Sequence, residues 1–144
     1  MADLGPGQKP IVMPHYPHMM SEDIDVWSAY LTGPVVPVKR VWYDVHVGKA
    51  VEVAGGAKEL LPRIAAGVTR KRIDVVAAVG GGYWVVEVKP YGSFLALGQV
   101  LTYTRLFVAE YRPDGEVWPV VVCREFDRDL MPDFERQGVG MIQI

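Results

Sequence analysis

The chain has 144 residues, half of them hydrophobic and 22% charged, and its formal net charge is −2. These values predict one globular domain with a buried core and exclude a disordered chain. The weak net charge gives no support to nucleic-acid binding over the whole surface, although a local basic patch could still contact phosphate groups. The single cysteine, Cys123, excludes an internal disulfide and fits a reducing compartment, so we expect a cytoplasmic protein. No apolar run is long enough to span a bilayer, so we expect no membrane partner.

Residues 1–20 are rich in proline and glycine and show no apolar periodicity. We expect them to form an extended arm, followed by a single domain over residues 21–144. His15 and His18 stand three residues apart in this arm, as a pair of metal ligands could. The interleaved prolines disfavour a helical presentation, so a surface turn is the preferred interpretation.

The first regular elements follow the arm. Ser21 is expected to cap a helix that ends at Gly33, because acidic residues follow Ser21 and apolar residues then recur at helical spacing. Residues 38–47 alternate between apolar and other side chains, which predicts a strand with one core face. Asp44 and His46 share the opposite face of this strand. That face would be exposed to solvent or would line a cleft.

A β-hairpin is expected in the middle of the chain. Residues 70–79 form its first strand, with the even-numbered positions on one face, and a glycine triplet at 80–82 makes the turn. Residues 83–89 return antiparallel to it, ending before Pro90. Before this hairpin, residues 58–66 are expected to form a short helix interrupted by a proline.

The rest of the chain predicts helices and strands in alternation. Ser93 is the expected N-cap of a long, largely buried helix that runs to about Tyr111. The continuous apolar run 117–123 is typical of a central strand parallel to its neighbour. A short helix at 129–136 and a last strand at 139–144 complete the order. The sequence therefore predicts an α/β domain with a mixed sheet.

Polar side chains converge on the hairpin. Glu87 and Lys89 lie two positions apart on one strand and share a face, and the hairpin can bring Asp74 opposite Glu87. Two carboxylates, helped by the backbone carbonyl of Val88, form a hard-oxygen site suited to Mg²⁺ or Mn²⁺. With a lysine beside them, such a site suits hydrolysis of a phosphodiester bond.

The long helix and the flanking segments add supporting residues. Gln99 and Tyr103 are one helical turn apart, so both could reach the site and orient a water molecule, Lys89 or a phosphate. Five further residues near the site are expected to contact DNA: Arg70, Lys71, Arg72, Tyr91 and Ser93. A Glu-x-Lys tripeptide alone is common on solvated strands, so the interpretation depends on the whole set of residues.

This set resembles the PD-(D/E)XK nuclease superfamily. The resemblance lies in Asp74, twelve intervening residues and then Glu87-Val88-Lys89, and Gln99 to Tyr103 is similar to the QxxxY motif of its RecB-like branch. The expected element order is similar to the restriction-endonuclease-like α-β-β-β-α-β core of that family, with an extra C-terminal helix and strand. The resemblance implies cleavage of DNA with Mg²⁺ or Mn²⁺, with Asp74 and Glu87 as metal ligands and Lys89 as the catalytic lysine.

The chain departs from the family pattern at one position, and it does not determine which acid of the first helix would join the metal site. Ile73 stands before Asp74, where the name of the family has proline. The family often adds an acid from the first helix, and the sequence does not choose among Glu22, Asp23 and Asp25.

Three functions are therefore compared. The first is a metal-dependent DNA nuclease whose partner is DNA. The second is a non-catalytic protein of the same fold, acting as a DNA-binding or viral or assembly component. The third is a hydrolase of small phosphoesters. A homo-oligomer or a larger nucleic-acid-processing assembly is a possible further partner.

Overall fold

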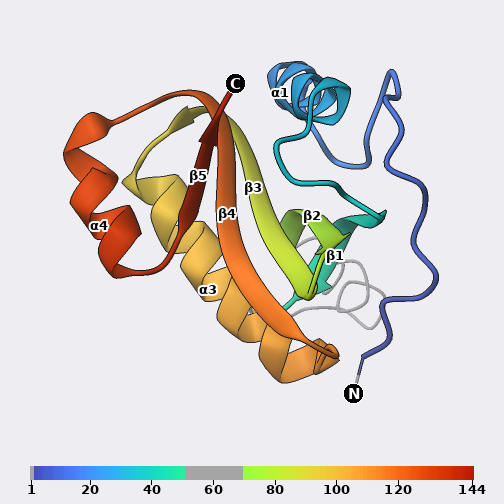
Figure 1. The fold of residues 1–144 in the computed structure, drawn as a ribbon. Coiled ribbons are helices and arrows are strands. Elements are labelled where there is room, and N and C mark those ends of the chain that lie inside the picture. Colours follow the sequence, from blue (N-terminus) through green and yellow to red (C-terminus); the bar gives the residue numbers. More distant parts are fainter. Residues whose placement is uncertain (1, 51–69) are drawn as a thin grey trace, which may run out of the picture.

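The structure is a computed structural model that describes residues 2–50 and 70–144 (Figure 1). The helix expected within residues 58–66 lies outside the described residues. The elements, in chain order, are α1 (Ser21–Thr32), β1 (Arg40–Val47), β2 (Lys71–Val79), β3 (Gly82–Gly92), α3 (Phe94–Tyr111), β4 (Glu116–Phe126), a 3-10 turn (Arg128–Leu130), α4 (Met131–Arg136) and β5 (Gly140–Gln143).

The strands form one sheet in the order β1-β2-β3-β4-β5. The first three strands pair antiparallel as a meander, and β4 then pairs parallel to both β3 and β5. The return from β3 to β4 passes through α3, as a parallel connection requires. The mixed-sheet α/β architecture and the order of its elements are thus confirmed.

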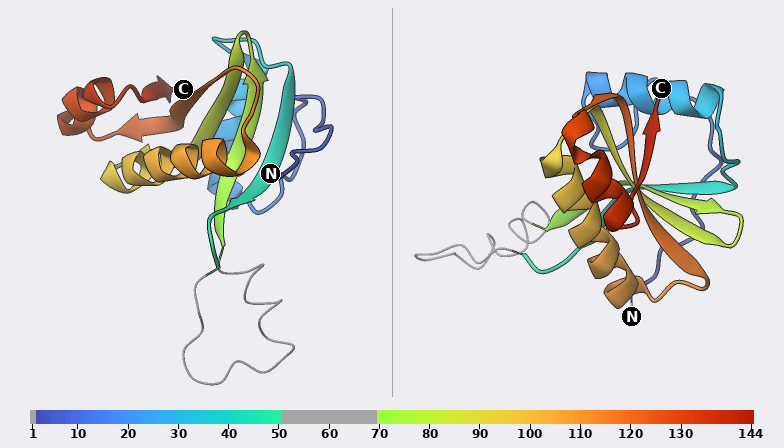
Figure 2. Two further views of the ribbon diagram at one scale, coloured as in Figure 1. Left: turned by 90° about the horizontal axis from the view of Figure 1, so that it is seen from below. Right: turned by 60° about the vertical axis from the view of Figure 1, so that its left-hand side comes forward.

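Helices pack on both faces of the sheet (Figure 2). On one face, α1 buries Val26, Trp27 and Tyr30 in an apolar cluster, which we call the α1-side cluster. On the other face, the buried residues of α3 and α4, such as Val100 and Phe134, join a second cluster, which we call the α3-side cluster. The free energy of folding therefore comes from two cores that share one sheet.

Two expected boundaries are corrected. The N-cap of α1 is Met20, which is extended at ψ 162°, and Ser21 is already helical, so no side chain caps this helix. Ser93 does cap α3, because its Oγ accepts a hydrogen bond from the N–H of Leu95 at 3.2 Å. β3 runs on through Pro90 to Gly92; Pro90 falls between the paired positions of the β3–β4 register, where its missing N–H removes no ladder bond.

The expectation of a single core face on β1 is wrong. Val41 belongs to the α1-side cluster, whereas Val45 and Val47 belong to the α3-side cluster. The change occurs at Asp44, whose φ of 53° interrupts the two-residue repeat of the strand. Aspartate adopts this left-handed conformation at lower cost than most residues.

The neighbouring strand changes face at the same level. Val75 and Ala77 of β2 pack in the α1-side cluster, while Ile73 packs with Val76 in the α3-side cluster. The alternation therefore breaks at Asp74, and the even positions of β2 do not share one face. Both irregular positions carry an aspartate, and they lie at the same level of the β1–β2 register.

The N-terminal segment lies along the outer edge of β1 (Figure 1). Gln8 forms an antiparallel bridge with Val41, and the Arg40 guanidinium donates to the carbonyl of Pro6 at 2.7 Å. Gly7 has a φ of +65°, and a Cβ there would come within 2.6 Å of the Trp42 ring. The segment thus covers a strand edge that would otherwise expose unpaired backbone groups.

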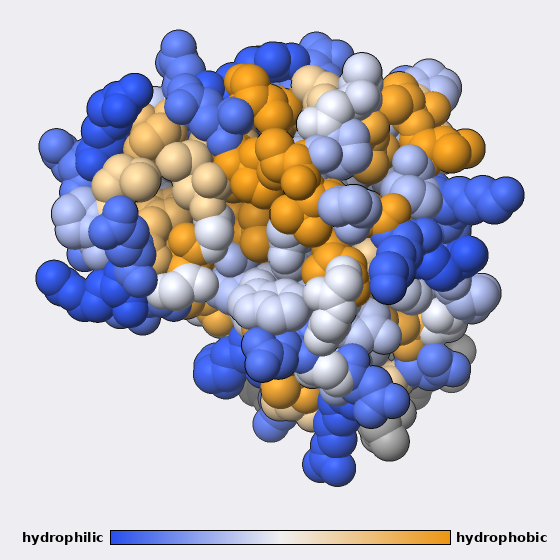
Figure 3. Space-filling view, viewed as in Figure 1, coloured by the Kyte–Doolittle hydropathy of each residue, from blue (hydrophilic) through white to orange (hydrophobic). Residues whose placement is uncertain are grey.

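Apolar side chains gather on the front face over β4 and β5, between α1 and α4 (Figure 3). A hollow of about 520 Å³ lies there, and Trp84, Trp118 and Ile142 contribute to its lining. Within residues 2–50 and 70–144, no helix is long and apolar enough to cross a membrane.

Candidate active site

The site begins where β2 and β3 separate. Their pairing ends at Val75 opposite Val86, although the register would next place Asp74 opposite Glu87. Instead, Oδ2 of Asp74 accepts a hydrogen bond from the backbone N–H of Val88 at 2.9 Å. A carboxylate thus takes the place of a backbone partner, and we call this point the β2–β3 fork.

Glu87 is the one buried charged residue in the described part of the chain, with 2% of its surface exposed. It shares the α3-facing side of β3 with Val85. Its Oε1 has no hydrogen-bond partner among the described residues. Burial raises the pKa of Glu87 well above its usual value, and the nearby charge of Asp74 raises it further. Burial also raises the pKa of Asp74.

Lys89 opposes part of this effect. Its Nζ lies 3.9 Å from Oε2 of Glu87, and a third of its side chain is exposed. The positive charge lowers the pKa of both Glu87 and Asp74, although burial remains the larger influence on each carboxyl. The structure therefore brings Asp74, Glu87 and Lys89 together, as their spacing predicts.

The two polar residues of α3 also reach the fork. Burial raises the pKa of Tyr103 most, and the negative charges of Glu87 and Asp74 raise it further, which places the phenol beside both carboxyl groups. A hydrogen bond with Gln99 lowers the pKa of Tyr103. Oε1 of Gln99 is buried without a hydrogen-bond partner among the described residues. Polar atoms of α3 thus lie near the carboxyl groups of β2 and β3.

One acid of the first helix acts on the site. The charge of Asp23, in the first turn of α1, raises the pKa of Asp74. Neither Glu22 nor Asp25 contributes to the raised pKa of Asp74. The sequence could not distinguish these three acids. It gives their order along the helix, but it does not show how α1 is oriented relative to the fork.

The donor set at the fork fits a hard divalent cation. Two carboxylates converge there, and Oε1 of Glu87 is buried without a hydrogen-bond partner among the described residues, so it has a free lone pair with which to ligate a cation. The N–H and C=O of one strand residue point to the same side, so the Val88 carbonyl also points to the side of Asp74. No group of three or more His, Cys, Asp or Glu in residues 2–50 and 70–144 has metal-binding geometry.

The expected DNA contacts are dispersed. Arg70 pairs with Glu110 at 2.9 Å and donates to the carbonyl of Gly48, so it joins α3 to the end of β1. Arg72 lies 3.7 Å from Asp44 and also contacts His18. The remaining members are Lys71, which is exposed, Tyr91, which is half exposed, and Ser93, which caps α3.

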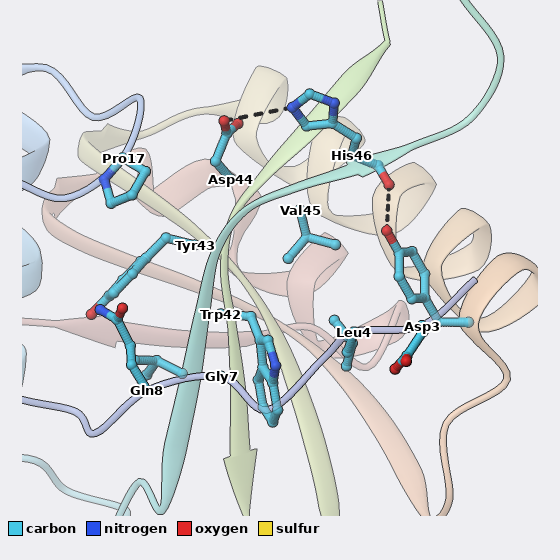
Figure 4. Close-up of a pocket in the computed structure, with 12 residues that line it drawn as sticks. Asp3, Leu4, Gly7, Gln8, Pro17, Trp42, Tyr43, Asp44, Val45 and His46 are labelled. Carbon is cyan, nitrogen blue, oxygen red and sulfur yellow. Dashed lines mark hydrogen bonds and ion pairs between the residues drawn. The ribbon is translucent and has the colours of Figure 1, made fainter. Parts of the chain in front are cut away.

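A separate hollow of about 530 Å³ lies between the N-terminal segment and β1 (Figure 4). Asp44 and His46 line it and lie 3.5 Å apart, and the Tyr111 hydroxyl donates to the His46 carbonyl at 2.9 Å. Its lining includes none of the fork carboxylates or Lys89. The polar face expected on residues 38–47 thus belongs to a cleft beside the arm.

The sheet and its helices match a known architecture. The crystal structure of a repair endonuclease from Pyrococcus abyssi superposes on 92% of this chain and 49% of its own, with a TM-score of 0.51 and 15% identity. The fold is restriction-endonuclease-like. A protein of unknown function matches 83% of the chain and 54% of its own, with a TM-score of 0.42 and 15% identity. The chain thus spans about half the length of each of these two structures.

Sequence comparison adds nothing to this likeness. No protein-family model matches the sequence, and no curated protein resembles it significantly. At 15% identity the structural likeness establishes the restriction-endonuclease-like fold. The chemistry must therefore be argued from the residues at the fork.

Proposed function

We propose that this chain is a divalent-metal-dependent DNA nuclease of the PD-(D/E)XK type that hydrolyses phosphodiester bonds at the β2–β3 fork. One observation carries the proposal: the Glu87 carboxylate is buried beside the carboxylate of Asp74, and one of its oxygens has no hydrogen-bond partner among the described residues. Burying the Glu87 carboxylate beside the partly buried carboxylate of Asp74 is unfavourable unless a cation or a proton compensates the charge. Lys89, at 3.9 Å and partly solvated, compensates only one of the two charges.

The residues that would hold the metal lie on three elements. Asp74 and Glu87 would supply carboxylate oxygens, and Val88 would supply its backbone carbonyl. Asp23 would add a further acid from α1, directly or through water. Mg²⁺ or Mn²⁺ bound there would polarise the scissile phosphate and lower the pKa of a coordinated water.

The other polar residues would position the reactants. The Lys89 ammonium, held beside Glu87, would attract the phosphate and stabilise negative charge that develops on it. Tyr103 and Gln99 would orient the attacking water or Lys89 from the α3 side. Packing of α3 against the fork would keep bulk water away from the buried Glu87 carboxylate and so strengthen these interactions.

The structural likeness supports this choice among the functions that the sequence leaves open. The matched protein is itself described as a repair endonuclease. The QxxxY helix at Gln99 and Tyr103 supports assignment to the RecB-like branch. A protein that had lost its activity would be expected to lose the buried Glu87 carboxylate as well, because a buried carboxylate beside Asp74 lowers stability without a cation.

The test is a cleavage assay with supercoiled plasmid, linear duplex and single strands, each with Mg²⁺, with Mn²⁺ and with EDTA. We expect cutting with either metal, none with EDTA, and loss of cutting in Lys89→Ala. Lys39→Ala, which removes an exposed lysine far from the fork, should cut like the unmodified protein. DNA binding without cutting under every condition would overturn the proposal in favour of a non-catalytic DNA-binding protein.

A further inference from the structure

We propose that a hollow along α3 binds unpaired bases, so that the preferred DNA substrate is single-stranded at the point of cleavage. This inference rests on the proposed nuclease function, because it concerns the strand whose phosphate would be cut. The hollow measures about 500 Å³, and its lining includes Lys71, Phe94, Leu95, Gln99 and Tyr103.

The hollow adjoins the candidate active site through Tyr103. Gln99 and Tyr103 both line the hollow, and the charges of Glu87 and Asp74 at the fork act on the Tyr103 phenol. A nucleotide bound in the hollow would therefore adjoin the carboxylates proposed to hold the metal. This adjacency indicates the DNA strand itself, rather than another protein, as the occupant.

Large apolar side chains are concentrated at one end of the hollow. Phe94 is 72% exposed and Leu95 is 64% exposed, in the first turn of α3; Tyr91, which precedes them in the chain but does not line the hollow, is 51% exposed. These are three of the eight large exposed apolar residues in the described part of the chain. Neither Phe94 nor Leu95 belongs to the two core clusters of the sheet. Their exposure is therefore not explained by the packing of the fold.

The chemistry of the hollow fits a single strand. Phe94 and Tyr103 are nine residues apart, which is about 14 Å along an α-helix, so the hollow has a long axis. Lys71 supplies a cation from the start of β2, and the first turn of α3 has no acidic residue that would repel phosphate. A single strand offers both phosphates and open base faces, whereas a duplex keeps its base faces stacked inside.

The test measures binding without metal, in EDTA, so that cleavage cannot interfere. Fluorescent oligonucleotides of equal length are compared as a single strand, an abasic single strand and a duplex. We expect the unmodified protein to prefer the single strand. The double variant Phe94→Ala/Leu95→Ala should bind it about tenfold or more weakly, as removal of base-stacking side chains does. Duplex and abasic affinities should hardly change. Val108→Ala, an exposed residue near the far end of α3, is the matched control.

The outcomes separate this inference from the proposed function. Equal or tighter binding of duplex, or an unchanged single-strand affinity in the double variant, would overturn the inference even if the protein cuts DNA. Preferential single-strand binding that is lost in the double variant would support it even if no cutting is seen. The salt dependence of binding should stay unchanged in the double variant, because neither side chain carries a charge.

Discussion

The carboxylate of Asp74 accepts a hydrogen bond from the backbone N–H of Val88 at the place where β2 and β3 stop pairing. The same side chain is therefore both a structural acceptor and a candidate metal ligand. Because the Val88 N–H would otherwise face the gap between the strands, the fork depends on this carboxylate for its shape. Substitutions at Asp74 can separate the two roles.

Asp74→Asn should abolish metal-dependent cleavage while the fold stays intact, because the amide oxygen can still accept from Val88. Asp74→Ala leaves that N–H without its acceptor and should be less stable than Asp74→Asn by about 1–2 kcal/mol. Urea unfolding of the two metal-free variants measures the difference. Equal stability of the two would show that the hydrogen bond to Val88 does not hold the fork.

Glu87 should make the stability of the metal-free protein fall as pH rises. Its folded pKa lies above the ordinary 4.5, first because of burial and then because of the charge of Asp74. The folded state therefore holds this proton more tightly than the unfolded state. The contribution of Glu87 to stability is complete below pH 4.5 and is lost as the pH rises through the folded pKa. The loss is about 1.4 kcal/mol for each pH unit that separates the folded pKa from the unfolded one.

The measurement is thermal unfolding from pH 4 to pH 8 in EDTA. Glu87→Gln should be more stable than the unmodified protein at pH 7, and the two should converge as the pH falls to about 4, where the unfolded carboxyl is also largely protonated. Glu125→Gln, at an exposed position of β4, is the matched control and should leave the slope unchanged. A Glu87→Gln protein with the same slope as the unmodified one would contradict the raised pKa.

Asp23 should contribute to metal binding, whereas Asp25 should not. The charge of Asp23 reaches Asp74, so Asp23→Asn removes negative charge from the site and should weaken Mn²⁺ affinity by about tenfold, or ~1.4 kcal/mol. Asp25→Asn on the same helix serves as the control. Titration calorimetry of the three proteins tests this, and equal weakening by both substitutions would indicate only a general loss of negative charge.

Tyr103→Phe should slow cleavage by about 10- to 100-fold through loss of positioning. The affinity for metal and the value of KM should change little, because the phenol is not a proposed ligand. Tyr111→Phe removes a hydroxyl from the same helix that donates to the His46 carbonyl, away from the fork, and should keep full activity. A fall in metal affinity for Tyr103→Phe would instead indicate a disturbed carboxylate pair.

The parts of the fold that sequence predicts well are those governed by local periodicity and turn chemistry. The hairpin at Gly80 to Gly82, the Ser93 cap and the apolar run of β4 each depend on neighbouring residues, and each is present in the structure. The two-residue repeat of strands accounts for the proximity of Glu87 and Lys89, and the hairpin register brings Asp74 to the level of Glu87, although pairing stops there and Asp74 accepts from the Val88 N–H instead.

The remaining features depend on contacts between distant segments. The face changes at Asp44 and Asp74 occur where the pairing of β1 with β2 and of β2 with β3 is interrupted, and no local pattern marks these positions. Arg70 looked available for phosphate because its partner, Glu110, is forty residues away at the end of α3. The choice of Asp23 likewise required the placement of α1 against the fork.

The most direct test compares the unmodified protein with Glu87→Gln in cleavage of a labelled DNA single strand at saturating Mg²⁺. Both proteins are prepared identically and are shown to be folded by thermal unfolding. We predict cleavage by the unmodified protein and a reaction slower by about a hundredfold or more in Glu87→Gln, since the amide replaces a charged ligand oxygen. Equal rates for the two proteins would show that the cleavage does not occur at the β2–β3 fork and would contradict the proposed site.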